Sequence, residues 1–168
     1  MSVIKKINKL SQSEFIKVFA NIFENASWIA EDAYNKKPFE DFADLSQKMF
    51  NIFANTTKEK QLKILRAHPD LADRTKIGLL TPESKKEQSN AGLDQCSEKE
   101  FKEFKDLNDK YKKKFGFPFI YAVKGKSKIE ILSNFRQRLS YDINVEFNEA
   151  KKQVKKIANL RLNEINKK

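Results

Sequence analysis

The chain has 168 residues, of which 39% are hydrophobic and only 4 are glycine and 4 proline, a composition that excludes a disordered chain and a turn-rich all-β fold. Its formal net charge of +11 would suit a polyanionic partner such as nucleic acid. However, 29 of the 34 basic residues are lysines, whereas recognition of bases and phosphates relies on the planar arginine fork, which argues against nucleic-acid binding as the main role. A lysine-rich helical module that binds nucleic acid or another polyanion is therefore kept only as the alternative function.

Predicted helices are marked along the chain by capping boxes, in which Ser or Thr is followed three residues later by Glu. Four such boxes occur, at Ser11/Glu14, Thr56/Glu59, Ser97/Glu100 and Ser127/Glu130. Two apolar runs at helical spacing precede the second box, first Phe15, Val18, Phe19, Ile22 and Phe23, and then Phe39, Phe42, Leu45, Met49, Phe50 and Phe53. A further helix is expected after Thr56, and it should reach His68.

In the second half of the chain, Thr81 is expected to cap a helix that has Pro82 at its first position and runs through Leu93. The helix after Ser97 should end near Gly116. Two more helices should follow Ser127, with apolar positions at Ile129, Leu132, Phe135 and Leu139, and then at Val145, Phe147, Val154, Ile157, Leu160 and Leu162. Residues 1–168 are therefore predicted to form a single compact all-α, multi-helix domain with one short extended segment near residues 117–123.

Cysteine and histidine usage restricts both the compartment and the chemistry. Cys96 is the only cysteine, so no internal disulfide can form, and with a single histidine a Cys/His zinc site is not expected. The start of the chain, "MSVIKKINKLSQSEF", has no apolar run long enough for a signal peptide, and no segment approaches a membrane span. The C-terminal "NEINKK" is not a peroxisomal tripeptide. The expectation is a cytoplasmic protein without a metal site or membrane contact.

His68 is the only histidine, and it stands directly before a proline in "LRAHPDLADR". Proline disfavours the α region for the residue before it, so the helix that follows Thr56 should end at or just before His68. The partial negative charge of a helix C-terminus favours a protonated imidazole, and imidazole ordinarily titrates near neutral pH. The position suits a proton-transferring group, but position alone favours a histidine that merely caps the helix end.

The stretch "TPESKKEQSNAGLD" is predicted to carry polar residues on one helical face. Ser84, Glu87, Gln88 and Ala91 fall at positions i, i+3, i+4 and i+7 of a helix that begins at Pro82. A hydroxyl, a carboxylate and an amide above a small residue suit the wall of a pocket. An ordinary solvent-facing stripe is an equally good interpretation of the same pattern.

The run "FGFPFIYAV" is aromatic and strand-like, but Pro118 excludes a central strand and leaves backbone amide and carbonyl groups without ladder partners. Such groups can bind a small polar ligand that has amide-like edges. The alternative is a buried connector that packs Phe117 and Phe119 into the core, and these two rings are expected to be buried in either case.

Four stretches, "AHPDLA", "LTPESKKEQSNAGL", "LNDKYKKKFGFPFIYAVKG" and "FRQRLSYDINVEFNEAKKQVKKIANLRL", resemble in order and spacing the family of 2-oxo-4-hydroxy-4-carboxy-5-ureidoimidazoline (OHCU) decarboxylases. These enzymes complete the conversion of urate to allantoin. The resemblance covers nearly the whole chain. It implies an all-helical fold, a homodimer, no metal or organic cofactor, and a small-molecule substrate. The segment "DLADRTKIGLL" departs from a connector that is often richer in glycine or alanine, and its conformation is not predicted.

The resemblance also implies which residues form the site. It places the catalytic histidine at His68 and the glutamate of the "S-x-x-E-Q" motif at Glu87. The residues that it assigns to substrate binding are Pro69, Ser84, Gln88, Phe119, Ile120, Tyr121, Ala122, Val123 and Arg161. Residues 119–123 match a stretch that meets the substrate largely through backbone groups.

The implied reaction is cofactor-independent decarboxylation of OHCU to (S)-allantoin and carbon dioxide. Loss of carbon dioxide leaves an electron pair on the ring carbon, and the protein must supply electrostatic stabilisation and a positioned proton. His68 could give that proton, or could first deprotonate the substrate hydroxyl, and both roles stay open. Glu87 would orient the imidazole, and Arg161 could neutralise an anionic substrate.

Overall fold

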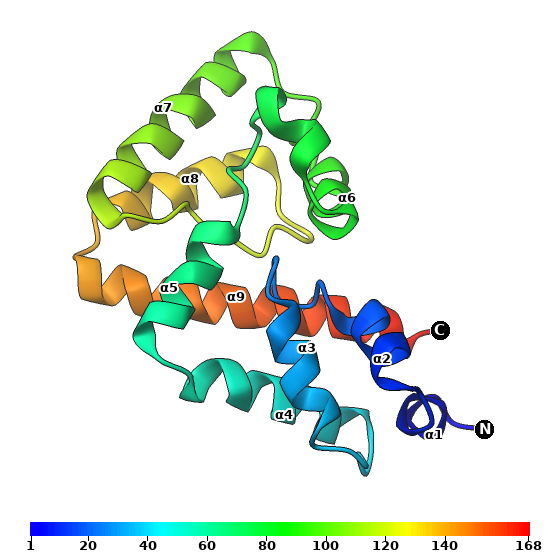
Figure 1. Cartoon of the computed structure of the whole chain (residues 1–168). Helices are drawn as coiled ribbons and strands as arrows, with labels where there is room; N and C mark the ends of the chain where they lie inside the picture. The colour runs from blue at the N-terminus through cyan, green and yellow to red at the C-terminus, as the bar shows by residue number, and fades with distance from the viewer. The chain divides into compact units, whose positions relative to one another are not determined.

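The computed structural model describes residues 1–168 and contains helices but no strand, which confirms the predicted all-α class. The first half of the chain (Figure 1) forms α1 (Val3–Asn8), α2 (Gln12–Phe19), α3 (Ser27–Tyr34), α4 (Phe42–Asn55) and α5 (Lys58–Ala67). The second half forms the 3-10 helix η1 (Arg74–Leu79), α6 (Pro82–Asn90), α7 (Glu98–Phe115), α8 (Lys128–Leu139) and α9 (Ile143–Asn166). The expected extended segment, residues 117–123, has no regular secondary structure.

The chain groups into two compact units. One, here called the terminal unit, comprises Met1–Ile64 and Lys155–Lys168, and the other, the central unit, comprises Leu65–Val154. The boundaries between them fall within α5 and α9. That residues 1–168 act as a single domain stays a prediction.

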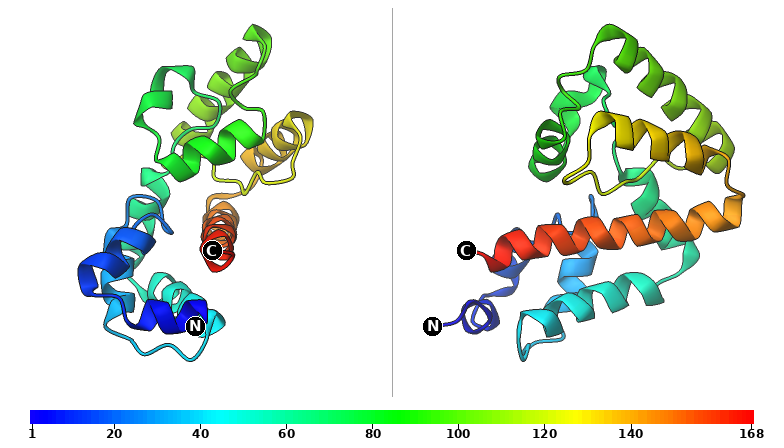
Figure 2. Two further views of the ribbon diagram at one scale, coloured as in Figure 1. Left: turned by 90° about the vertical axis from the view of Figure 1, so that its right-hand side faces the viewer. Right: turned by 180° about the vertical axis from the view of Figure 1, so that it is seen from behind.

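The terminal unit is built around phenylalanine side chains. Helix α3 packs against both α2 and α4, an arrangement that can be followed in the two views of Figure 2. The ring of Phe15 lies 4.6 Å from that of Phe19, and the ring of Phe23 lies 5.2 Å from that of Phe53, measured between centroids. Most of the apolar positions in the two predicted runs are buried and belong to this core.

The core of the central unit surrounds Tyr111 on α7, a helix that packs against α8. Four rings lie within 6 Å of the Tyr111 ring, between centroids: those of Phe115, Phe117, Phe119 and Phe135, at 4.5, 5.9, 5.5 and 5.8 Å. Phe117 and Phe119 are buried as expected. These ring contacts hold residues 117–123 against α7 and α8.

Three of the four predicted capping boxes are present, at Ser11, Ser97 and Ser127. The box at Thr56 is wrong, because α5 begins at Lys58 and the side chain of Thr57 accepts the hydrogen bond from the Lys60 amide, at 3.2 Å. A one-residue shift therefore moves the cap from the first threonine of the pair to the second.

Two helix ends illustrate the use of glycine. Helix α7 ends as predicted at Gly116, whose φ of +79° is a left-handed conformation that terminates helices. Helix α6 ends at Asn90, before the predicted Leu93, because Gly92 also adopts a left-handed φ, of +77°. The sequence contained the signal for this earlier stop.

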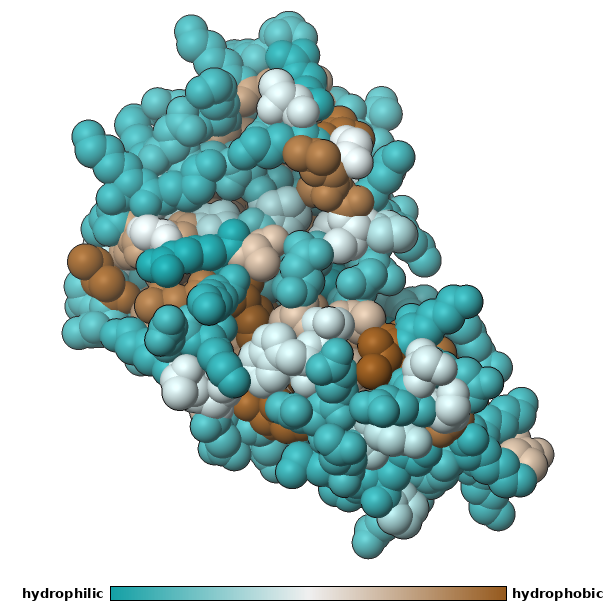
Figure 3. All heavy atoms as spheres, in the orientation of Figure 1, coloured by the Kyte–Doolittle hydropathy of each residue, from teal (hydrophilic) through white to brown (hydrophobic).

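Hydrophilic residues cover most of the face drawn in Figure 3. On α7 the lysines are paired along the helix, with Lys105 Nζ 3.0 Å from Asp109 Oδ2 and Lys110 Nζ 2.9 Å from Asp106 Oδ2. Three side chains expected in apolar stripes are exposed instead, namely Val18, Ile129 and Val145. None of the helices has the length and the apolar character needed to cross a membrane.

Candidate active site

His68 is the first residue beyond the end of α5, as the proline that follows it predicts. Its backbone amide donates to the carbonyl of Leu65 at 3.2 Å, which tightens the last turn of the helix. The side chain is only 8% exposed. A histidine that served as a surface cap would keep its ring in solvent, so the burial excludes that interpretation, and the catalytic role of His68 stays a prediction.

The loop after His68 is held by two side chains from α7. Lys112 Nζ lies 2.6 Å from Asp70 Oδ2, and Asn108 Nδ2 donates to the carbonyl of Leu71 at 3.0 Å. Ala72 has a left-handed φ of +56°, a conformation that costs about 1 kcal/mol for a residue other than glycine. The loop therefore keeps an unfavourable backbone conformation because side chains of α7 hold it in place.

Helix α6 turns its polar face inward. It begins as predicted, with the side chain of Thr81 accepting from the Ser84 amide at 3.2 Å and Pro82 in the first turn. Ser84 is 4% and Gln88 8% exposed, while Glu87 is half-buried. A solvent-facing stripe is therefore excluded for Ser84 and Gln88.

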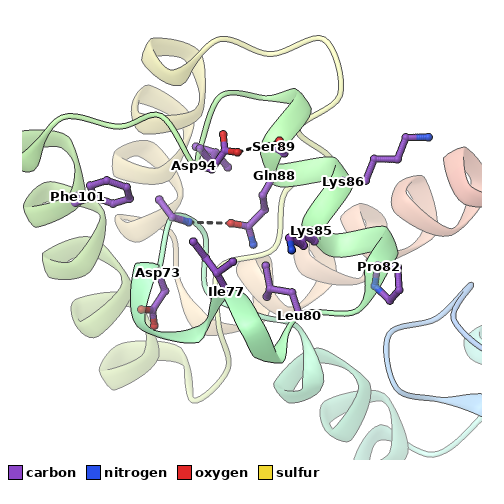
Figure 4. Close-up of a pocket in the computed structure, with 12 residues that line it drawn as sticks. Asp73, Ile77, Leu80, Pro82, Lys85, Lys86, Gln88, Ser89, Asp94 and Phe101 are labelled. Carbon is purple, nitrogen blue, oxygen red and sulfur yellow. Dashed lines mark hydrogen bonds between the residues drawn. The ribbon is translucent and has the colours of Figure 1, made fainter.

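Gln88 joins α6 to the loop after His68. Its Oε1 accepts from the Ala72 amide at 3.0 Å, the bond drawn in Figure 4, and its Nε2 donates to the carbonyl of Asp70 at 3.2 Å. Both ends of this amide side chain thus fix backbone groups within four residues of His68. The first and second sequence motifs lie together in the central unit as a result.

The third motif, the run "FGFPFIYAV", is also tied to the end of α5, because Arg66 Nε donates to the carbonyl of Gly116, three residues before Phe119, at 3.0 Å. Phe119, Ile120 and Val123 are buried, whereas Tyr121 and Ala122 are half-buried. The Phe119 ring stacks on Phe135 with centroids 3.9 Å apart. Phe119 is thus a core side chain, and the binding of a ligand by the backbone of this segment stays a prediction.

Arg161 belongs to the terminal unit, on α9. It is buried, its Nη2 lies 2.9 Å from Glu24 Oε2, and its Nη1 donates to the carbonyl of Asn21 at 2.7 Å. The guanidinium is therefore paired with a carboxylate of its own unit. The role of Arg161 towards a substrate stays a prediction.

Four residues that support the site were missed in the sequence: Asn108, Lys112, Arg138 and Gln153. Arg138 Nη1 donates to the carbonyl of Ile120 at 2.6 Å, and the Ala122 amide donates to Gln153 Oε1 at 3.0 Å. One signal was available, since Asn108 falls within the apolar stripe of α7 and an amide on such a face needs buried partners.

A cavity of about 290 Å³ opens between η1, α6 and the start of α7. Its apolar lining includes Ile77, Leu80 and Phe101, and Lys85 and Lys86 stand at its α6 wall (Figure 4). Gln88 is the one predicted site residue that lines it. No three His, Cys, Asp or Glu side chains gather where they could hold a metal ion.

Comparison with known proteins identifies one family. A family model described as OHCU decarboxylase matches residues 8–163. The chain is 42% identical over 165 residues to the "Uric acid degradation bifunctional protein" of Bacillus sp. (strain TB-90), and the aligned region covers 98% of this chain and 32% of that protein. It is 37% identical to the "2-oxo-4-hydroxy-4-carboxy-5-ureidoimidazoline decarboxylase" of Halalkalicoccus jeotgali, across 96% of this chain and 90% of that one. The chain thus spans about a third of the bifunctional relative.

A solved structure has the same fold. The "Crystal structure of OHCU decarboxylase in the presence of (S)-allantoin" superposes with a TM-score of 0.70 at 26% identity, over 84% of this chain and 92% of the other.

Proposed function

Because this chain belongs to the OHCU decarboxylase family, we propose that it catalyses the cofactor-independent decarboxylation of OHCU to (S)-allantoin and carbon dioxide in urate degradation. The observation that carries the proposal is the buried His68, whose following loop is fixed by Gln88 from the inward polar face of α6. A single histidine held in this way suits a reaction that needs one positioned proton.

The reaction breaks the bond between the ring carbon and its carboxylate. The carboxylate leaves as carbon dioxide, and its bonding electrons pass into the adjacent ring carbon–nitrogen double bond, whose nitrogen takes up a proton; the product of this step is an enol that still carries the hydroxyl on the first carbon. Delivery of a proton to one face of the neighbouring ureido-bearing carbon, with loss of the hydroxyl proton so that the first carbon becomes a carbonyl, completes (S)-allantoin. His68 is proposed to hold that proton, either as its first action or after it has deprotonated the substrate hydroxyl.

The remaining site residues are proposed to orient the reactants. Glu87 would orient the imidazole of His68, while Ser84 and the backbone of residues 119–123 would bind the ureido and ring amide edges. Since both ends of the Gln88 amide bond the loop after His68, its main contribution is to hold that loop beside the substrate. Pro69 would border the ligand, and Arg161 would offset a negative charge.

We also propose a cytoplasmic homodimer. The resemblance to the family supports the dimer, and the single half-buried Cys96 is compatible with a reducing compartment. Sedimentation equilibrium should give a mass twice that of the chain, and a mass equal to that of one chain at micromolar concentration would contradict the dimer.

The test of the function is a direct assay with freshly generated OHCU. The spontaneous reaction gives racemic allantoin, so catalysis is read from circular dichroism that reports an excess of the (S) enantiomer. We expect that signal to appear faster than spontaneous decay and in proportion to the protein concentration. Allantoin that forms at the spontaneous rate and without optical activity would refute the proposed function.

A further inference from the structure

A buried ion pair lies beside the segment of residues 119–123 in the central unit. Arg138 on α8 is 2% exposed and Glu146 on α9 is fully buried. Arg138 donates from Nε to Glu146 Oε1 at 2.8 Å, and also from Nη2 to the same oxygen. The Tyr111 hydroxyl donates to that oxygen too, at 2.6 Å.

Such a pair needs an explanation other than stability. Removing two charges from water is expensive, and replacing a buried ion pair by well-packed apolar side chains is often neutral or stabilising. The neighbourhood is already aromatic, with Phe119 stacked on Phe135. One of the five arginines of the chain stands at this position, where it makes a contact that an apolar side chain could not make.

What Arg138 adds is a bond to the segment. Its Nη1 donates to the carbonyl of Ile120 at 2.6 Å, and its guanidinium carbon lies 4.4 Å from the centroid of the Phe119 ring. Two residues further on, Gln153 Oε1 accepts from the Ala122 amide at 3.0 Å, while its Nε2 donates to Glu149 Oε1 at 2.9 Å. The segment is therefore tethered to α8 and α9 at two backbone groups.

We propose that Arg138, oriented by Glu146 and Tyr111, is a positioning residue that fixes the Phe119–Val123 backbone for substrate binding. The inference rests on the proposed function. A site that reads amide edges with backbone groups depends on where those groups point, and a displacement of about 1 Å is enough to cost much of the rate. Only a planar fork can bond Glu146, bond the Ile120 carbonyl and cover the Phe119 ring at the same time.

The test compares Arg138→Lys with Arg136→Lys. Both replace an arginine of α8 that pairs with a glutamate, but Arg136 is exposed and pairs with Glu103 on α7. Lysine at position 138 keeps the charge opposite Glu146 and loses the fork. We expect KM for OHCU to rise about tenfold or more, with a smaller change in kcat, in the Arg138 variant alone. Amide hydrogen exchange of residues 119–123 should become faster in that variant.

A second variant distinguishes loss of positioning from loss of folding. Arg138→Met combined with Glu146→Met removes both charges together, so no unpaired charge is left buried. We expect it to fold with the native far-UV spectrum and to show the same rise in KM and the same faster exchange.

The proposal is overturned if either folded variant keeps the wild-type KM and the wild-type exchange rates in residues 119–123. It is also overturned if neither variant folds, because the pair would then serve the fold. Should the wild-type protein fail to turn over OHCU, the proposed function is wrong, and the exchange rates still decide whether Arg138 fixes the segment.

Discussion

Glu87 lies half-buried on the inner face of α6, one turn after the buried Ser84. A carboxylate at such a position can accept a hydrogen bond from a histidine ring and so fix which nitrogen carries the proton. Acid–base groups that are held in place typically contribute about 100-fold or more to a rate. The proposed orienting role of Glu87 is therefore large enough to measure.

Glu87→Gln should lower kcat by about 100-fold while leaving the helical content unchanged, because the amide keeps the shape of the side chain and loses its charge. Stopped-flow circular dichroism on fresh OHCU measures this rate. The matched control is Glu83→Gln, one turn earlier on the same helix, which should retain the wild-type rate. A loss of less than about threefold in Glu87→Gln would remove the orienting role.

At the level of elements, the site depends on how α6 and α7 hold the loop after His68. Gln88 and Asn108 bond three backbone groups of Asp70, Leu71 and Ala72. Without these bonds the three backbone groups would lose their partners, and nothing would offset the unfavourable left-handed conformation of Ala72. The loop conformation is therefore a property of the packing of two helices.

Gln88→Met should destabilise the protein by about 2 kcal/mol, because the Ala72 amide and the Asp70 carbonyl lose their partners. Urea unfolding measures the free energy. Ser89→Ala is the control on the same helix, since Ser89 bonds only the exposed Asp94, and it should stay within about 0.5 kcal/mol of wild type. Equal free energies of unfolding for the two variants would contradict the role of Gln88 in holding the loop after His68.

Local signals explain which elements were predictable. The Ser97 box and Gly116 define both ends of α7, because cap and terminator act through neighbouring residues. Helix α3 was not predicted, and its N-cap residue, Ala26, offers no side-chain hydrogen bond. The choice between Thr56 and Thr57 also depended on backbone geometry that the residue types do not contain. Helices that lack a capping side chain or a terminating glycine could be identified only from the structure.

The site was predictable to the same extent. The shared face of Ser84, Glu87 and Gln88 on α6 followed from helical spacing, and the end of α5 followed from Pro69, whereas the inward direction of that face needed the structure. The bonds from Gln88 to Ala72, from Asn108 to Leu71 and from Arg138 to Ile120 were not predictable, because each joins residues at least 16 positions apart in the sequence. Spacing within one helix does not contain that information.

For the whole molecule, the charge of +11 is compatible with burial of two ion pairs, Arg138 with Glu146 and Arg161 with Glu24. The excess of lysine lies largely at exposed positions, where pairs contribute little to stability. Stability at high pH instead depends on a buried hydroxyl. Burial raises the pKa of Tyr111 well above its usual value, and the hydrogen bond to Glu146 raises it further.

Alkaline pH should therefore unfold the protein through Tyr111. The folded state keeps a proton that the unfolded chain releases at about pH 10, so the associated stability is fully present below pH 10 and is lost as the pH rises above it. We expect the Tyr111 component of the absorbance at 295 nm to appear only together with loss of helical ellipticity. Tyr111→Phe should lack that component and unfold at a higher pH. Ionisation of Tyr111 in the fully helical protein would contradict this.

The most direct test of the account is the handedness of the allantoin formed by His68→Asn. Asparagine keeps a polar side chain at the end of α5 but cannot transfer a proton near neutral pH. We predict that the variant has the wild-type helical content and forms (S)-allantoin at least about 100-fold more slowly, so that the product is racemic, while the surface control Lys63→Asn stays at the wild-type rate. Production of (S)-allantoin by His68→Asn at the wild-type rate would contradict the central claim.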